Sequence, residues 1–354
     1  MATSNPPPGT ARATIGIISM GDMGSGLARL VVANGYAVAT NYTIDRALAA
    51  GVELTPNDQI LISQCDVILS VVPPRDAIAT ANRIIDGLKG ADRSHPLYFA
   101  DMNAVSPATC QTIAELFATT GDGTTEAARF IDGSILGGPP APPHSLSSSS
   151  AEEWTRPLLS TSGPHNLYAI SDLGGHPVSE YGAHLASVLR IKHISETIGA
   201  ASGLKMCFAS LSKGFAAVAV QAVTTAHRLG VLDDLKDSLA TLAPANLERM
   251  EKAVVGMSPK AYRWVREMEE ISATHEVDGG FEGEKIFAGA ADVFRIVAED
   301  TVLGNEKPAV PGLGVAGGKK RVRGTTSEDV ARCMAEGLEN KKRRRVDEEQ
   351  DDVR

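Results

Sequence analysis

Three glycines near the N-terminus have the spacing of a phosphate-binding turn. Gly21, Gly24 and Gly26 follow an apolar run and open an amphipathic stretch in ATIGIISMGDMGSGLARLVVANGYAVAT, residues 13–40. Glycine at a strand end permits a tight turn. Glycine at a helix start lets backbone N–H groups approach a pyrophosphate, where the helix dipole is positive. The pattern predicts dinucleotide binding, and a merely structural tight turn is the alternative.

Serine occupies the first glycine position of the usual fingerprint in this turn. The pattern G-x-G-x-x-G would place glycine at residue 19, where this chain has Ser19. We expect Ser19 and Met20 to line the cofactor together with Gly21, Met23 and Gly24.

A lysine at the start of a long apolar stretch is the candidate acid–base group. Lys205 lies between Leu204 and Met206, and partial desolvation there favours the neutral amine. A neutral amine can accept a hydroxyl proton while hydride leaves for a nicotinamide, and the ammonium can return that proton in reverse. Taken alone, such a lysine more often extends from a helix end into solvent, and it is the flanking motif described below that favours the acid–base role. Lys213, two turns along the same face, is expected to bind an anionic substrate group or to be structural.

The end of the second predicted strand bears on the choice between NADP and NAD. An acidic residue there would hold the ribose 2′-hydroxyl of NAD and repel a 2′-phosphate, and Asn41 is not acidic. Asn41 and Thr43 can hydrogen-bond a phosphate, and Arg46 can reach it with its guanidinium. Asp45 opposes this reading, and Arg46 has the alternative role of starting the next helix. The pattern favours NADP.

Apolar and helical stretches alternate over the first 200 residues. The predicted strands are 14–19, 37–41, 67–72, 97–101 and 130–135, and the predicted helices are 24–34, 75–88 and 106–119. Continuous apolar strands are typical of a sheet covered on both faces, so the fold class is α/β with a doubly wound parallel Rossmann sheet. Less regular strand candidates at 157–161 and 187–191 follow a low-complexity Pro/Ser-rich loop at 139–154.

The remainder of the chain changes to helical patterns. Helices are predicted at 206–229, 232–242, 246–256, 260–274 and 284–303. The first of these is apolar on most faces and must therefore be buried. We expect a disordered leader at 1–12, a dinucleotide-binding domain at 13–200, an all-α substrate and dimerisation domain at 201–303, and a flexible charged tail at 304–354.

Composition narrows the class of protein. The chain has 354 residues, 43% of them hydrophobic, and a net charge of −9, which argues against general nucleic-acid affinity. Four widely separated cysteines indicate reduced thiols, and the histidines form no helical pair, so no metal is predicted. No continuous apolar run approaches the roughly 20 residues of a membrane span. We expect a cytoplasmic protein, with nuclear import through Lys341–Arg345 as a weaker alternative.

Four segments, in order, resemble the 3-hydroxyacid dehydrogenase family, which includes 6-phosphogluconate dehydrogenase. They are IGIISMGDMGSGLA, DMNAVSP, DGSILGG and GAASGLKMCFASLSKG, at residues 15–28, 101–107, 132–138 and 199–214. The resemblance spans residues 13–300 and is greatest to the fungal-type branch with a phosphogluconate dehydrogenase-like C-terminal domain. It implies NAD(P)-dependent, reversible oxidation of a hydroxyl group β to a carboxylate. It also implies Lys205 as acid/base and a homodimer formed through the helical domain.

The resemblance also assigns residues at the ends of the strands. Asn103 would contact the nicotinamide ribose or the substrate, because ligands bind at the carboxyl ends of strands in open α/β sheets. The alternative is that Asn103 only caps the following turn. Val72 and Pro73 would line the nucleotide cleft.

Ser134, Gly137 and Gly138 would form a loop for an anionic small-molecule substrate through backbone N–H groups and a hydroxyl, with plain turn glycines as the alternative. One departure is visible. Many family members have asparagine four residues after the lysine, where this chain has Ala209 beside Ser210, which could substitute in part. Two other functions therefore stay open: an imine or enamine reductase, in which the lysine tends to be replaced, and a non-catalytic NADP-binding regulatory protein.

Overall fold

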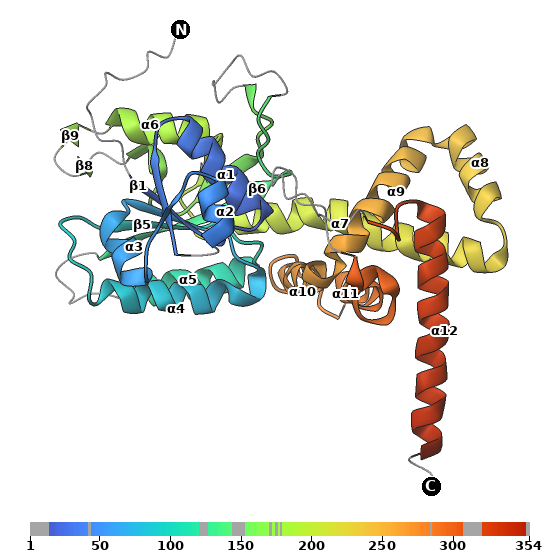
Figure 1. Cartoon of the computed structure of the whole chain (residues 1–354). Helices are drawn as coiled ribbons and strands as arrows, with labels where there is room; N and C mark the ends of the chain where they lie inside the picture. The colour runs from blue at the N-terminus through green and yellow to red at the C-terminus, as the bar shows by residue number, and fades with distance from the viewer. Residues whose placement is uncertain are drawn as a thin grey trace. The chain divides into compact units, whose positions relative to one another are not determined.

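The computed structural model divides the chain into two compact units, Met1–Lys205 and Met206–Arg354 (Figure 1). The sequence placed this division between residues 200 and 201. The residues that the structure describes are 14–41, 44–119, 127–143, 153–169, 172–173, 176–177, 179–283, 285–306 and 321–351. The predicted leader and most of the Pro/Ser-rich loop lie outside them.

An eight-stranded sheet forms the centre of the N-terminal unit, in the order β10-β7-β6-β5-β4-β1-β2-β3. All neighbouring pairs are parallel except β6 with β7. The strands are β1 (Thr14–Ile18), β2 (Ala37–Thr40), β3 (Glu53–Leu54), β4 (Val67–Ser70), β5 (Leu97–Asp101), β6 (Ala128–Leu136), β7 (Leu158–Ser162) and β10 (Ile191–Ser195). A separate pair joins β8 (Asp172–Leu173) to β9 (His176–Pro177). The expected mostly parallel Rossmann sheet is confirmed.

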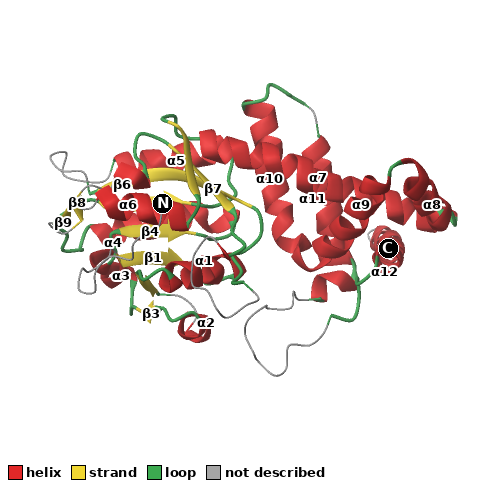
Figure 2. Ribbon diagram, turned by 90° about the horizontal axis from the view of Figure 1, so that it is seen from above, coloured by secondary structure: helices red, strands yellow, loops and turns green. Residues whose placement is uncertain are grey.

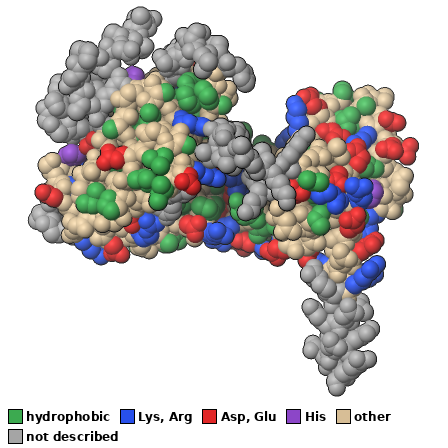
Figure 3. Space-filling model, in the orientation of Figure 1, with side chains coloured by type: hydrophobic (Ala, Val, Ile, Leu, Met, Phe, Trp, Pro, Cys, Tyr) green, Lys and Arg blue, Asp and Glu red, His purple; other side chains and the backbone are tan. Residues whose placement is uncertain are grey.

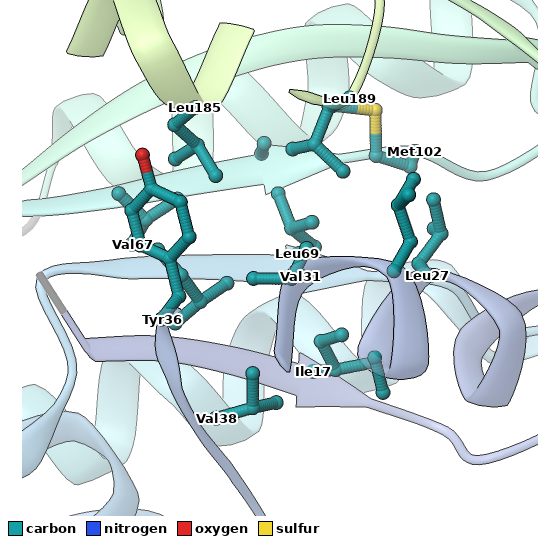
Figure 4. Packing of buried hydrophobic residues seen from close by; sticks show 14 of the residues in the cluster. Ile17, Leu27, Val31, Tyr36, Val38, Val67, Leu69, Met102, Leu185 and Leu189 are labelled. Carbon is teal, nitrogen blue, oxygen red and sulfur yellow. The ribbon is translucent and has the colours of Figure 1, made fainter. Parts of the chain in front are cut away.

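Helices cover both faces of this sheet, as continuous apolar strands require. They are α1 (Asp22–Ala33), α2 (Ile44–Ala49), α3 (Asp58–Gln64), α4 (Ala77–Leu88), α5 (Pro107–Ala118) and α6 (Ser179–Val188), with 3₁₀ turns at Pro74–Asp76 and Leu167–Ala169. One buried cluster joins Ile17 of β1 to α1 and α6, and 14 of its residues are drawn in Figure 4. A second cluster joins Ile18 and Phe99 to α3, α4 and α5. Neighbouring residues of one strand therefore belong to opposite layers.

The sequence located the start of α5 correctly. Ser106 is its N-cap, with the hydroxyl accepting a hydrogen bond from the Thr109 N–H at 3.2 Å, and Pro107 is the first helical residue. The strand predicted at 187–191 was wrong in its first half. Residues up to Val188 belong to α6, and β10 begins only at Ile191. In the sequence, a short buried apolar run at the end of a helix cannot be distinguished from a buried strand.

The regular elements described in the C-terminal unit are all helical (Figure 2). They are α7 (Ala200–Leu229, which begins in the N-terminal unit), α8 (Leu232–Leu242), α9 (Pro244–Met257), α10 (Ala261–Val277), α11 (Ile286–Arg295) and α12 (Ser327–Asp351), with short turns at Ser258–Lys260, Ile296–Asp300 and Val302–Asn305. The prediction of an all-α domain is confirmed. Helix α7 begins six residues before the predicted Met206.

The flexible tail predicted at 304–354 was wrong for its second half. Residues 327–351 form α12, and Val330, Ala331, Cys333 and Met334 on its first turns are buried. The charged composition of this helix concealed its short apolar face, which packs on the rest of the unit.

Helix α7 is long and apolar enough to pass a test for a membrane span. An 18-residue window has a mean hydropathy of 1.4, and 39% of that window is buried inside the protein. This is weak support for a span, because core helices of soluble proteins meet the same criterion.

On the molecular face in Figure 3, acidic and basic side chains are interspersed.

Candidate active site

The turn between β1 and α1 has the backbone form of a nucleotide-binding loop. Ser19 has a φ of +78°, a left-handed conformation that glycine adopts readily and serine rarely. The usual fingerprint has glycine at this position. Ser19 therefore adopts the left-handed turn conformation that the glycine would have. Gly21 follows as the N-cap of α1, and none of the described side chains caps that helix start. The first-turn N–H groups are therefore suited to bind an anion.

The packing of α1 against the preceding turn leaves no room for a side chain at Gly24. A Cβ atom at Gly24 would lie 1.9 Å from the Ser19 carbonyl oxygen, and at Gly26 it would lie 2.8 Å from Cδ of Pro140. Both glycines therefore permit close approach between α1 and neighbouring backbone. The sequence explained Gly24 by contact with a pyrophosphate, whereas the first clash lies with Ser19. Met23 packs partly buried against the core on this side of the sheet.

Arg46 is brought to this turn from α2. Its Nη1 donates to the Met20 carbonyl oxygen at 3.0 Å and lies 3.9 Å from Oδ1 of Asp22. Asn41 lies at the end of β2 and is paired elsewhere, because its Nδ2 donates to Oδ1 of Asp58 at 2.5 Å. The structure therefore groups Arg46, rather than Asn41, with the residues of the glycine turn.

Asn103 joins the ends of β4 and β5. Its Oδ1 accepts from the Val72 N–H at 2.7 Å, and its Nδ2 donates to Oγ of Ser70 at 3.1 Å. The side chain is buried, and both ends of its amide are engaged within the protein. Asn103 thus fixes the Val72–Pro73 turn, in which Val72 is buried and Pro73 is exposed. This is a larger structural role than the turn cap considered from the sequence.

Lys205 lies beside the carboxyl-terminal part of β6. Its Nζ donates to the Ile135 carbonyl oxygen at 2.5 Å, and its side chain is partly buried. Ile135 belongs to the segment at 132–138, so two of the four segments that suggested the family meet at this contact. The amine is held at the edge of the sheet where open α/β folds bind ligands.

The three residues predicted for the substrate loop differ in exposure. Ser134 is fully buried, and its hydroxyl has no hydrogen-bond partner among the described residues. The hydroxyl is therefore not exposed to solvent, and its contact with substrate stays a prediction. Gly137 and Gly138 are exposed, and Gly137 has a φ of +123°, which requires glycine.

Two predicted substrate residues, Ser210 and Lys213, belong to the C-terminal unit and have partners there. The Ser210 hydroxyl donates to the Cys207 carbonyl oxygen at 2.7 Å. The Lys213 ammonium pairs with the Glu267 carboxylate and lies 5.3 Å from the ring centre of Trp264. The Glu267 carboxylate neutralises Lys213, which agrees with the structural alternative, and binding of an anionic substrate group by Lys213 stays a prediction.

Sequence reasoning missed Asp132, a fully buried carboxylate in β6. It accepts hydrogen bonds from β7 and from the first turn of α7. The signal was present: a charged residue in the apolar strand predicted at 130–135 must find partners, since an unpaired buried charge is very costly.

The glycine turn, the strand order and the lysine at the sheet edge define a Rossmann-type dinucleotide-binding protein. Residues 14–91 match the family described as NADP oxidoreductase, coenzyme F420-dependent. Residues 226–297 match a domain family of unknown function. The nucleotide-binding class expected from the turn is therefore confirmed.

Solved structures show the same fold over most of the chain. A conserved hypothetical protein from Sinorhizobium meliloti is 20% identical with a TM-score of 0.55, covering 93% of this chain and 97% of its own. The 3-hydroxyisobutyrate dehydrogenase of Salmonella typhimurium is 18% identical with a TM-score of 0.56, covering 80% and 93%. That of Mycobacterium tuberculosis, solved with L-serine, is 17% identical with a TM-score of 0.55, covering 82% and 94%.

At these identities the likeness to solved structures shows the fold. The NADP oxidoreductase match includes the first of the four segments, and the fold agrees with the resemblance drawn from all four. Residues 14–91 are thus similar to an NADP oxidoreductase family, and most of the chain has the fold of the 3-hydroxyisobutyrate dehydrogenases.

Proposed function

We propose that the chain oxidises small β-hydroxy acids, and reduces the corresponding carbonyl compounds, with NADP(H) as cofactor and Lys205 as acid/base. The observation that carries the proposal is the contact between Lys205 Nζ and the Ile135 carbonyl oxygen at 2.5 Å. A fixed amine at the carboxyl edge of a Rossmann sheet is suited to exchange a proton with a substrate hydroxyl.

The residues of the β1–α1 turn fit a dinucleotide. The start of α1 lacks a cap among the described side chains, and Gly21 places no side chain in front of it. Arg46 lies next to this turn through Met20, with its side chain 31% exposed. A guanidinium beside the glycine turn favours a ligand with an additional phosphate, which supports NADP over NAD.

Lys205 has a defined task in this reaction. NADP⁺, when bound, supplies the acceptor for the hydride. The neutral amine of Lys205 accepts the proton of the substrate hydroxyl as the carbon loses hydride, and the ammonium donates it back during reduction. The Ile135 carbonyl oxygen accepts a hydrogen bond from this amine and so fixes where the proton is exchanged.

The substrate carboxylate has a candidate binding segment in Gly137 and Gly138. Both glycines are exposed, so their backbone N–H groups are accessible to an anion, whereas Lys213 is paired with Glu267. Ala209 offers no polar group, and Ser210 is bonded to its own helix. We therefore expect a small substrate that Lys205 holds without a neighbouring amide. The Mycobacterium tuberculosis relative was solved with L-serine, which is a β-hydroxy acid.

A panel assay tests this function. Purified protein is incubated with NADP⁺ and L-serine, 3-hydroxyisobutyrate or 3-hydroxypropanoate, and absorbance at about 340 nm reports the reduced cofactor. Turnover of at least one acid, faster with NADP⁺ than with NAD⁺, is expected. Cofactor binding without turnover of any acid, or of its carbonyl counterpart with NADPH, would favour the regulatory alternative.

We also propose that the chain forms a homodimer through α7. Exposed apolar side chains at Phe208, Leu211, Val218 and Leu229 are spaced by three, seven and eleven residues, which places them along one face of the helix. Leu211→Glu would put a charge in this face and is expected to shift the mass from dimer to monomer in light scattering. A wild-type mass of one chain would contradict the dimer.

A further inference from the structure

The Asp132 carboxylate is the centre of a buried hydrogen-bond network in the N-terminal unit. Its Oδ2 accepts from Oγ of Ser162 at 2.6 Å and its Oδ1 from Oγ of Ser202 at 2.6 Å. Three backbone N–H groups also donate to Oδ2: Gly199 at 2.9 Å, Ala201 at 3.0 Å and Ser202 at 3.3 Å. One side chain of β6 thus holds β7 and the start of α7.

The Asp132 carboxylate lies where it can accept hydrogen bonds from the first N–H groups of α7. The first N–H groups of a helix lack intrahelical partners, and the helix dipole makes them partly positive. Asp132 satisfies these groups with a full negative charge. Gly199 permits the approach, since it has a φ of +98° and an added Cβ would lie 3.2 Å from Pro107 of α5.

Asp132 and Lys205 join the same strand to the same helix. Asp132 holds the first turn of α7, and Lys205 lies just beyond that turn. Its Nζ returns to the carbonyl oxygen of Ile135, three residues after Asp132 on β6. Strand β6 and helix α7 are therefore joined by hydrogen bonds at two positions, Asp132 and Ile135. This limits how far the Lys205 amine can move along the sheet edge.

We infer that Asp132 is the positioning residue for Lys205. It acts through the first turn of α7 and does not touch substrate, because it is fully buried. The inference rests on the proposed acid–base function of Lys205. A displacement of about 1 Å in a reacting group can lower a rate by roughly 100-fold, so a rigid helix start matters for kcat more than for binding.

A double-mutant cycle tests the inference. Asp132→Asn keeps the size but turns an acceptor into a donor that faces the helix N–H groups. We expect it to lower kcat by about 10- to 100-fold, while KM and NADPH affinity change less than about threefold. In a Lys205→Met background the same substitution is expected to cause no further loss, because its effect passes through the lysine.

Two serines on β7 supply a second test variant and its matched control. Ser162 donates to Asp132, whereas Ser160, two residues earlier on β7, is buried with a hydroxyl that has no partner among the residues described. Ser162→Ala is expected to lower kcat, and Ser160→Ala to leave it unchanged. If Asp132→Asn does not fold, Ser162→Ala with Lys205→Met completes the cycle.

The outcomes separate the two proposals. Losses that add in the double variant, or an equal fall of kcat and NADPH affinity, would assign Asp132 a general structural role and overturn the inference while leaving Lys205 as acid/base. Full activity of Lys205→Met would overturn the proposed function and, with it, this inference.

Discussion

Asp101 and Asp132 face each other across the paired strands β5 and β6, yet their carboxylates have opposite surroundings. Asp132 holds the start of α7, whereas Oδ2 of Asp101 is buried without a hydrogen-bond partner in the described part of the chain. The Oδ1 atom of Asp101 accepts from the Asn103 N–H at 2.8 Å. One carboxylate is thus satisfied as an anion and the other is not.

Protonation of Asp101 is expected to govern the pH dependence of stability. Burial raises the pKa of this carboxyl from 3.8 to about 7, although hydrogen bonds from Asn103 oppose the shift. The folded state therefore binds the proton more tightly than the unfolded state. This contribution to stability is fully present below about pH 4 and is lost as pH rises through about 7.

Asp101→Asn tests this prediction because the amide cannot ionise. We expect the Tm of the wild type to fall by several degrees relative to the variant between pH 5 and pH 8. Differential scanning calorimetry at each pH measures it, and parallel curves for the two proteins would show that Asp101 does not titrate in this range.

Arg46 is expected to decide the preference for NADPH. In the proposed role, Arg46 donates a charge-assisted hydrogen bond to the 2′-phosphate, typically worth roughly 1.5–3 kcal/mol, so Arg46→Ala should lower NADPH affinity about tenfold or more. NADH affinity should change little. Lys89→Ala, at an exposed lysine of the same unit, is the control.

Fluorescence titrations with both cofactors measure this difference. Equal losses for NADPH and NADH would mean that Arg46 only supports the turn through the Met20 carbonyl oxygen.

Gly24 is expected to be required for folding as well as for binding. A Cβ at Gly24 would lie 1.9 Å from the Ser19 carbonyl oxygen, so Gly24→Ala must displace α1 from β1. We expect a loss of about 1–3 kcal/mol, in the usual range for overpacking. Urea denaturation measures it against Gly138→Ala, where the added Cβ meets no described atom within 4 Å. Equal stability of the two variants would contradict the clash.

The β1–α1–β2 unit and the sheet were predictable because their signals are local. Continuous apolar runs marked the strands, and Ser106 with Pro107 marked a helix start. Helices α2 and α3 and the two-residue strand β3 were missed, since elements of two to seven residues carry little periodicity. Helix α12 was missed because its buried face is short and its composition is charged.

The candidate site was predictable only in part. The positions of Lys205 and the glycine turn follow from their neighbours in sequence. The salt bridge of Lys213 and the burial of Ser134 do not, because they depend on Glu267 and on neighbouring strands that are distant in the chain. The role of Asp132 was missed for the same reason, because its five hydrogen bonds come from β7, from Gly199 and from the first turn of α7, at least 30 residues away.

Lys205 is proposed to exchange the substrate proton. The direct measurement compares wild type with Lys205→Met in steady-state reduction of NADP⁺ by the β-hydroxy acid that the wild type uses best, with NADPH affinity measured alongside. We predict that kcat falls by at least about 100-fold, in the range for general acid–base groups, while NADPH affinity stays within about threefold. A variant that binds NADPH normally and retains near-wild-type kcat would contradict the acid–base role of Lys205.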